Sequence, residues 1–421
     1  MYSVPVRLRL PIAIVAALVV AEAAVLVMRP RGLVEPLDVA SRAYFSAAQV
    51  ERAETFRRGQ LWLFGAQTAL ELGLLVLIVR RPPRRLLRER RRQVLAGAVA
   101  AAALSATLTV ATLPLRVVSR ERARDVGLVT QGWVGYAGDV AKSTAIGAGL
   151  AGAGGALLVF GMRRFRRGWW APAAAVIVGF GVVTTYVTPV VLDPLFNTFT
   201  ALPAGETRTA VLELARRAGV DVGQVYVMDA SRRTTAANAY VAGLGRTKRV
   251  VLYDNLLADF EPAEVRLVVA HELGHVRYRD VPHGLLFLAI VAPFGMLAAA
   301  RLAERVGPRD ALGTAAAVPA VVLGVGVMAP AITFTSNQLS RAVEQRADAY
   351  SLELTGEPET FVAFQRRITL QNVSDPDPPA ATHWLLGTHP TTIERIGLAE
   401  RFGAGSTTPA RSGAAEPPGG S

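Results

Sequence analysis

The sequence predicts an α-helical polytopic membrane protein with a polar α+β domain attached to its membrane spans. Of the 421 residues, 51% are apolar, and many of these lie in long blocks. Two polar segments lie between or after the last blocks, and the first contains the motif HELGH at 271–275. Because apolar blocks of this length cross a bilayer, the chain combines a membrane part with a water-facing part.

Seven apolar segments are long enough to cross a hydrocarbon core about 30 Å thick, which needs roughly 17–25 helical residues. Any one of them could be a buried helix of a soluble protein, but seven in one chain favour a membrane protein. The segments are Pro11–Met28, Leu61–Val79, Val94–Val118, Thr144–Met162, Trp169–Leu192, Gly284–Ala303 and Ala311–Phe334.

The composition excludes several kinds of site. The chain has no cysteine, so it contains no disulfide, no thiolate metal site and no cysteine nucleophile. The formal charge is +13, but the arginines cluster at the ends of apolar blocks instead of along one soluble face. We therefore expect no nucleic-acid partner, and any metal site must use histidine and carboxylate.

The polar segments divide the chain into five parts. We expect five spans in 1–192, a first polar segment in 193–283, two spans in 284–334, a second polar segment in 335–404 and a disordered tail in 405–421. The two polar segments are expected to form one domain. Disorder is expected in the tail because it consists mostly of Gly, Ser, Pro and Ala.

Helical and extended patterns alternate within the first polar segment. Thr207–Ala218 has the spacing of an amphipathic helix. Gln224–Ala230 and Lys248–Asn255 are short β-branched and aromatic runs that predict strands, and Asn238–Gly245 is a candidate for a third. A further helix is predicted to start near Glu261, just before the HELGH motif.

The HELGH motif has the spacing of a metal-binding helix. His271 and His275 are four residues apart, so both imidazoles project from one helix face and can bind one metal ion. Glu272 lies beside that face and can take a proton from a water molecule that attacks a carbonyl carbon. The alternative is an ordinary surface helix with two histidines, but the apolar run 268–270 favours a helix packed on most sides.

A catalytic zinc site needs a third protein ligand, and a second helical stretch, Ser340–Gly356, offers one. Glu344 and Asp348 are one turn apart there and share a face. We expect Glu344 to bind the metal and Asp348 to orient a ligand histidine or to tie the helices together. The alternative is a solvated face on which Arg341, Glu344 and Asp348 interact at i,i+3 and i,i+4 spacing.

Together these residues resemble the CAAX prenyl protease type 1 family of integral-membrane zinc metallopeptidases. The similarity covers most of the chain after about Tyr186. It rests on five motifs in family order: PLFNTF (194–199), NAYVAGLGRTKRVVLYDNLL (238–257), VVAHELGH (268–275), SRAVEQRAD (340–348) and HPTTIERI (389–396).

The resemblance implies seven helices that enclose a water-filled chamber, with a gluzincin-like zinc-protease domain over it. It implies one Zn²⁺ per chain, bound by His271, His275 and Glu344, and it implies Glu272 as the general base. His389 matches a residue that stabilises the oxyanion formed during amide hydrolysis.

The resemblance also assigns residues around this centre. Arg395 lies near His389 in the sequence and is expected to support the site, although it could only form an ion pair, and His389 could merely precede a helix. Asn238, Ala239 and Tyr240 belong to the segment 238–243, which matches one that offers a sheet edge, along which the substrate lies as an added strand. Asn238 could instead be a turn residue.

The predicted function is a zinc-dependent membrane endopeptidase that hydrolyses peptide bonds of membrane-associated or lipid-modified, CAAX prenyl-like substrates. The expected partners are such a peptide or protein and membrane lipids, and the oligomeric state stays open. One alternative is an HtpX-type quality-control protease, whose usual four spans fit less well. Another is a non-catalytic zinc-containing scaffold, in which Glu272 would have no use.

The expected location is a bacterial plasma membrane, because the Ala/Arg/Val-rich composition indicates a GC-rich genome. The loops 80–92 and 163–167 carry eight and four arginines and belong in the cytoplasm by the positive-inside rule. This rule places the protease domain outside the cytoplasm, whereas the resemblance implies the cytosolic side.

Overall fold

In the part of the chain that the structure describes, seven helices are long and apolar enough to cross a membrane, which confirms the fold class predicted from the sequence. The structure is a computed structural model, and it describes residues 6–87, 92–243, 245, 248–308 and 310–406. Most of the predicted tail 405–421 and part of the loop 80–92 lie outside these residues. The seven helices are α1 (Val6–Met28), α2 (Ala47–Arg80), α4 (Gln93–Asp125), α5 (Trp133–Phe165), α6 (Trp170–Val187), α10 (Asp280–Val306) and α11 (Val318–Thr355).

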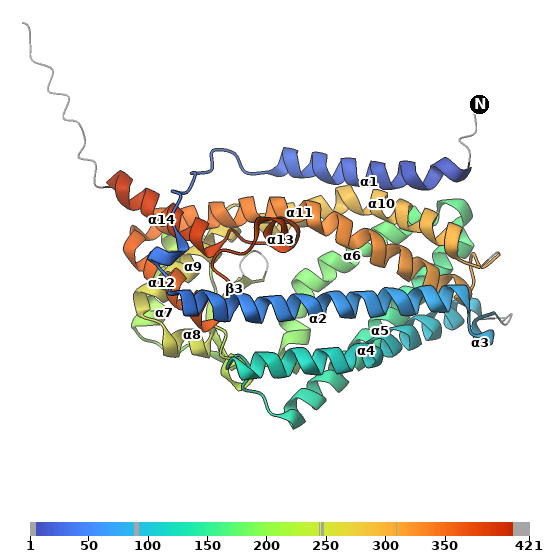
Figure 1. Cartoon of the computed structure of the whole chain (residues 1–421), viewed down its shortest axis with the longest axis horizontal. Helices are drawn as coiled ribbons and strands as arrows, with labels where there is room; N and C mark the ends of the chain where they lie inside the picture. The colour runs from blue at the N-terminus through green and yellow to red at the C-terminus, as the bar shows by residue number, and fades with distance from the viewer. Residues whose placement is uncertain (1–5, 88–91, 244, 246–247, 309, 407–421) are drawn as a thin grey trace, which may run out of the picture.

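The shorter elements gather at one end of the long helices, and the start of α1 and the short helix α3 (Arg84–Leu87) lie at the opposite end (Figure 1). The division of the chain at 192, 283, 334 and 404 stays a prediction. The remaining helices are α7 (Glu206–Arg217), α8 (Asp254–Asp259), α9 (Pro262–Arg277), α12 (Pro358–Gln371), α13 (Ala380–Leu386) and α14 (Thr392–Ser406), and the strands are β1 (Phe199–Ala201), β2 (Gln224–Met228), β3 (Ala239–Ala242) and β4 (Arg249–Tyr253).

Small residues let α10 and α11 pack closely within the membrane part. Ala298 and Ala300 are completely buried. A Cβ added at Gly324 of α11 would lie 2.5 Å from the carbonyl oxygen of Ala299, so this position requires glycine. Close backbone approach of this kind stabilises the packing of transmembrane helices, because apolar side chains gain little free energy by leaving lipid to contact one another.

The four strands form one sheet in the order β1-β2-β4-β3. The strand β4 pairs parallel with β2 and antiparallel with β3, where Tyr240 lies opposite Val251. The three runs expected to be extended are thus β2, β3 and β4. The sequence analysis did not predict β1, which pairs antiparallel with β2. In the described part of the chain, β3 is an outer strand of the sheet.

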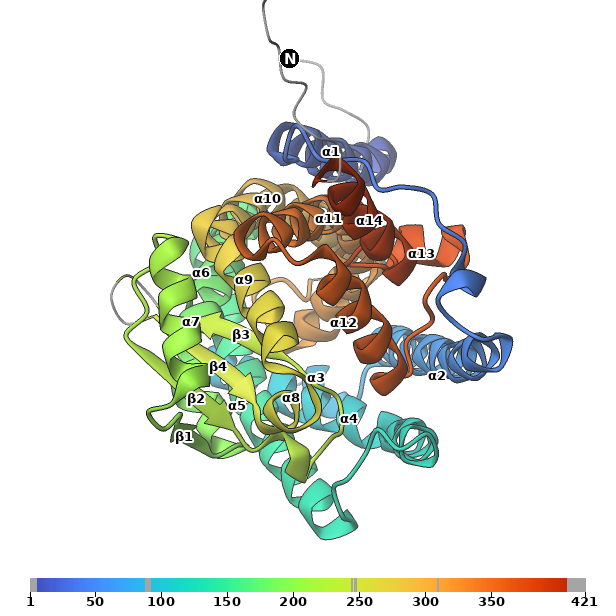
Figure 2. The same cartoon turned by 90° about the vertical axis from the view of Figure 1, so that its left-hand side faces the viewer.

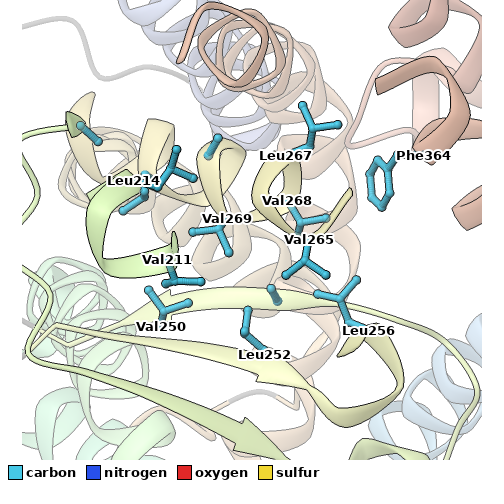
Figure 3. Packing of buried hydrophobic residues seen from close by; sticks show 14 of the residues in the cluster. Val211, Leu214, Val250, Leu252, Leu256, Val265, Leu267, Val268, Val269 and Phe364 are labelled. Atoms are coloured by element: carbon cyan, nitrogen blue, oxygen red, sulfur yellow. The ribbon is translucent and has the colours of Figure 1, made fainter. Parts of the chain in front are cut away.

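The helix α9, which carries the HELGH motif, lies between the sheet on one side and α11 and α12 on the other (Figure 2). Its apolar side chains pack toward Val250 and Leu252 of β4 and toward α7 and α8 (Figure 3). Val265 and Val269 are 2% and 0% exposed, and this buried face fixes the rotation of α9 about its axis.

The last spanning helix continues without a break into the polar part of the chain. We expected a span Ala311–Phe334 and a separate helical stretch from Ser340, but α11 starts at Val318 and continues without interruption through Thr355. It ends at Gly356, whose φ of +71° is a left-handed conformation that glycine adopts without strain. One rigid element therefore connects the membrane part to Glu344.

Candidate active site

The start of α9 is fixed by a capping box. Glu261 precedes the helix, its side chain accepts a hydrogen bond from the backbone N–H of Glu264, and its own N–H donates to Glu264 Oε2 at 2.8 Å. Pro262 occupies the first turn, where its missing N–H costs nothing. The predicted start near Glu261 is confirmed, and the motif falls in the second half of the helix.

The structure brings the three predicted metal ligands together. Nε2 of His271 lies 3.1 Å from Nε2 of His275 and 3.2 Å from Oε2 of Glu344. Nε2 of His275 lies 3.7 Å from Oε1 of Glu344. One donor atom from each residue falls within 4.8 Å of the others, and two nitrogens with one carboxylate oxygen suit a cation.

Two contacts bring α11 close enough to α9 for this convergence. A Cβ added at Gly274 would lie 3.1 Å from Tyr350 Cδ1 and 3.4 Å from Ala347 Cα, so the glycine of the motif leaves room for α11. One turn further along, the Ser351 hydroxyl donates to the carbonyl of Leu267 at 2.8 Å. Because the backbones of α9 and α11 lie close together here, the Glu344 carboxylate reaches the two histidines.

Each of the two histidines is also held through its other ring nitrogen. Nδ1 of His271 lies 2.9 Å from Asp348 Oδ1, and Nδ1 of His275 lies 2.9 Å from Asp280 Oδ2. An ionised carboxylate only accepts, so both imidazoles carry a proton on Nδ1 and turn Nε2 toward Glu344. A single metal ion would bind both Nε2 atoms and the Glu344 carboxylate.

Charges around His271 control its proton affinity. Burial by itself would lower the pKa of His271, but hydrogen bonds to Asp348 and Glu344, together with their negative charges, raise it to about 10. A proton therefore competes with a metal ion for Nε2 of this histidine at neutral pH.

The carboxyl of Glu272 faces a cavity of about 780 Å³ beside the convergent donors. The cavity wall includes His275 and Glu344, and also Tyr240 of β3 and Tyr186 near the end of α6. Burial raises the pKa of Glu272 above its ordinary value, against the opposing charges of the two imidazoles. A carboxylate with a raised pKa is the stronger base, which suits proton abstraction.

The loop that precedes α14 brings His389 to the same centre. Nε2 of His389 lies 3.3 Å from Glu344 Oε2, and its side chain is 55% exposed. The loop is held by His383, whose Nε2 lies 2.8 Å from the carbonyl oxygen of His389. Arg395 lies deeper: its Nε donates to Asp348 Oδ2 at 2.8 Å.

Of the three predicted substrate residues, Tyr240 lines the cavity, whereas Asn238 and Ala239 are not part of its wall. Tyr253 N donates to the carbonyl of Asn238 at 3.1 Å, so Asn238 and Tyr240 direct their backbone groups toward β4. By alternation, Ala239 and Val241 direct theirs toward the outer edge. The N–H of Ala239 is capped by the side chain of Asn238 at 2.9 Å, whereas Val241 lines the cavity.

Sequence reasoning missed two residues near this site. Asp280 and Arg346, which are paired with each other, lie on the far side of His275 from Glu344. Val241 lies in the segment 238–243 that the resemblance assigned to the sheet edge, but only strand pairing reveals that its backbone groups face outward. A signal for Asp280 was present, since a carboxylate shortly after a ligand histidine is a common partner for its Nδ1.

Comparisons with known proteins agree with this geometry. Residues 201–401 match the model of peptidase family M48. The chain is 31% identical over 309 residues to a protein of Bacillus subtilis described as an uncharacterized metalloprotease, YhfN, and the match covers 71% of this chain and 72% of that protein. The chain belongs to peptidase family M48. It is therefore a membrane metalloprotease, and the family implies a metal cofactor.

Within the M48 family, the CAAX prenyl protease 1 proteins are among the relatives, as the resemblance implied. The Arabidopsis thaliana CAAX prenyl protease 1 homolog is 30% identical over 229 residues, and the chain spans about half (53%) of its length. The crystal structure of S. mikatae Ste24p has the same fold, with a TM-score of 0.74 at 19% identity over 95% of this chain and 100% of that one. The chain is thus a multi-pass M48 protein of the CAAX prenyl protease type 1 family.

Proposed function

We propose that this M48 protein is a zinc-dependent endopeptidase that cleaves a peptide bond of a membrane-associated or lipid-modified substrate. The convergence of His271, His275 and Glu344, with Glu272 on the wall of the adjoining cavity, carries the proposal. Two histidines and one glutamate leave a coordination position open, which is the pattern of catalytic and not of structural zinc.

The donor set fits one zinc ion. Both imidazoles direct Nε2 at the same point because their Nδ1 atoms are bound by aspartates, and an ionised carboxylate completes the set. Nitrogen and carboxylate ligands suit Zn²⁺. When bound, zinc supplies Lewis-acid chemistry, which polarises a carbonyl group and lowers the pKa of a water molecule.

The chain's own residues would perform the proton transfers. Glu272 takes a proton from the attacking water and passes it to the leaving amine. Nε2 of His389, which lies 3.3 Å from Glu344 Oε2, is available to donate to the oxyanion as negative charge develops on the carbonyl oxygen. Asp348 holds His271 in one orientation, and Arg395 holds Asp348.

We further propose that the substrate binds as an extended strand along the outer edge of β3. The outward backbone groups of Val241 lie on the cavity wall, where they can pair with a peptide. The same cavity is lined by Tyr186 at the end of α6 and by Val281 and Pro282 at the start of α10. Because these residues belong to spanning helices, a peptide anchored in the bilayer can enter from the membrane boundary.

The proposal is tested with purified full-length protein in detergent. Bound metal is measured by elemental analysis, and a quenched peptide is offered with and without a farnesylated cysteine. We expect about one zinc per chain, cleavage that stops when a chelator removes the metal, and recovery when zinc returns. The ratio of the two peptides reports whether a prenyl group matters. Undiminished cleavage by the metal-free protein would refute the metallopeptidase assignment.

We also propose that the protein lies in a bacterial plasma membrane with its protease domain outside the cytoplasm. The described part of the arginine-rich loop 80–92 follows α2, and the arginines of 163–167 lie at the end of α5, both at the end of the helices away from the protease domain (Figure 1). By the positive-inside rule that end is cytoplasmic. Alkaline phosphatase fused after Ala404 should be active, and a fusion within 80–92 should be inactive. Activity only at the second position would reverse the orientation.

A further inference from the structure

A second aspartate, outside the motif helices, binds the ligand histidine that Asp348 does not reach. Asp280 is the first residue of α10 and follows α9 after a two-residue turn. Arg279 in that turn has a φ of +56°, a left-handed conformation that costs a non-glycine residue about 1 kcal/mol or more. This turn returns the chain toward α9, so that Asp280 Oδ2 lies 2.9 Å from Nδ1 of His275.

A cation from α11 holds the Asp280 carboxylate in place. Nη2 of Arg346 donates to Asp280 Oδ1, the oxygen that His275 does not use. The Arg346 guanidinium also lies over the ring of Tyr278, 4.2 Å from its centre. The Asp280 side chain is 10% exposed, so water competes little for these bonds.

The two histidines therefore have equivalent supports from different parts of the chain. His271 contacts Asp348, which in turn contacts Arg395. In the same way His275 contacts Asp280, which contacts Arg346. In each series a carboxylate accepts from Nδ1 and a guanidinium neutralises the carboxylate.

We propose that Asp280 is a positioning residue that fixes the tautomer and the ring orientation of His275, and that Arg346 fixes Asp280. The inference rests on the proposed zinc site. A carboxylate on Nδ1 makes Nε2 more basic and stops ring rotation, and loss of such a partner lowers metal affinity by about 10–100-fold.

The test uses full-length protein in detergent, with zinc affinity measured by competition against a chelator and cobalt binding followed by its visible spectrum. We expect Asp280→Ala to weaken zinc binding by about 10–100-fold and to alter the cobalt spectrum. Asp280→Asn should weaken it less, because the amide oxygen still accepts from Nδ1. The zinc affinity of Arg346→Gln should lie between those of the wild type and Asp280→Ala. If Asp280→Ala does not fold, Arg346→Gln provides the test.

The matched control is Asp375→Asn. Asp375 forms another largely buried ion pair, with Arg57 Nε 2.7 Å from its Oδ2 and 4% of its side chain exposed. This variant should lose stability and keep the zinc affinity of the wild type. Wild-type affinity and cobalt spectrum in Asp280→Ala would overturn the inference, as would an equal loss of affinity in Asp375→Asn. Failure of the wild type itself to bind zinc would instead reject the proposed zinc site.

Discussion

Arg395 binds both carboxylate oxygens of Asp348, through Nε at 2.8 Å and Nη2 at 2.5 Å. The Asp348 side chain is completely buried, and that of Arg395 is 19% exposed. A buried pair of this kind tolerates the loss of neither partner, because the remaining charge has no water to solvate it. It joins α14 to α11 directly behind His271.

Replacement of Asp348 by alanine tests this pairing. We expect the free energy of unfolding to fall by about 3 kcal/mol or more, because Arg395 becomes an unpaired buried cation. Thermal unfolding of the metal-free protein in detergent measures the loss. The control is Glu213→Ala, which removes an exposed ion pair with Arg216 and should change stability little. Equal effects of the two substitutions would contradict the account.

Zinc affinity should depend on pH through His271. In the metal-free protein its pKa is raised to about 10, so Nε2 carries a proton at neutral pH that zinc must displace. Affinity is therefore predicted to rise with pH by about tenfold per unit between about pH 7 and 9 and to fall as the pH is lowered. Calorimetry in buffers of different ionisation enthalpy should report about one proton released by this residue. Affinity that does not change with pH would contradict the raised pKa.

Substrate pairing along β3 is tested at Val241. Its N–H points toward the outer edge by strand alternation, so proline removes that donor without breaking a bond to β4. We expect Val241→Pro to lower kcat/KM for a peptide by about fivefold to tenfold, the worth of one hydrogen bond, and to leave bound zinc unchanged. The control Val241→Thr keeps the N–H and a β-branched side chain. Equal kcat/KM in both variants would argue against strand addition.

The chemistry of the site was largely readable from the sequence, because helical spacing is local. The four-residue separation of His271 and His275 defines one face, and the same separation of Glu344 and Asp348 defines another. The approach of these two helix faces is a matter of tertiary packing and cannot be derived from local spacing. It depended on Gly274, whose missing side chain admits α11.

Features that depend on backbone conformation or on tertiary pairing were missed. The left-handed turn at Arg279, which aims Asp280 at His275, has no sequence signal because arginine seldom adopts it. The three residues of β1 are too few to show a period. The continuity of α11 was missed because its composition changes from apolar to polar near Thr335, although the helix does not end there.

We propose that Glu272 acts as the base beside a metal held by His271, His275 and Glu344. The most direct test measures bound zinc and peptide cleavage in the same preparations of wild type and Glu272→Gln. We expect about one zinc per chain in both and a loss of turnover of about 10²-fold to 10⁴-fold in the variant. Cleavage by Glu272→Gln at the wild-type rate, with zinc retained, would contradict it.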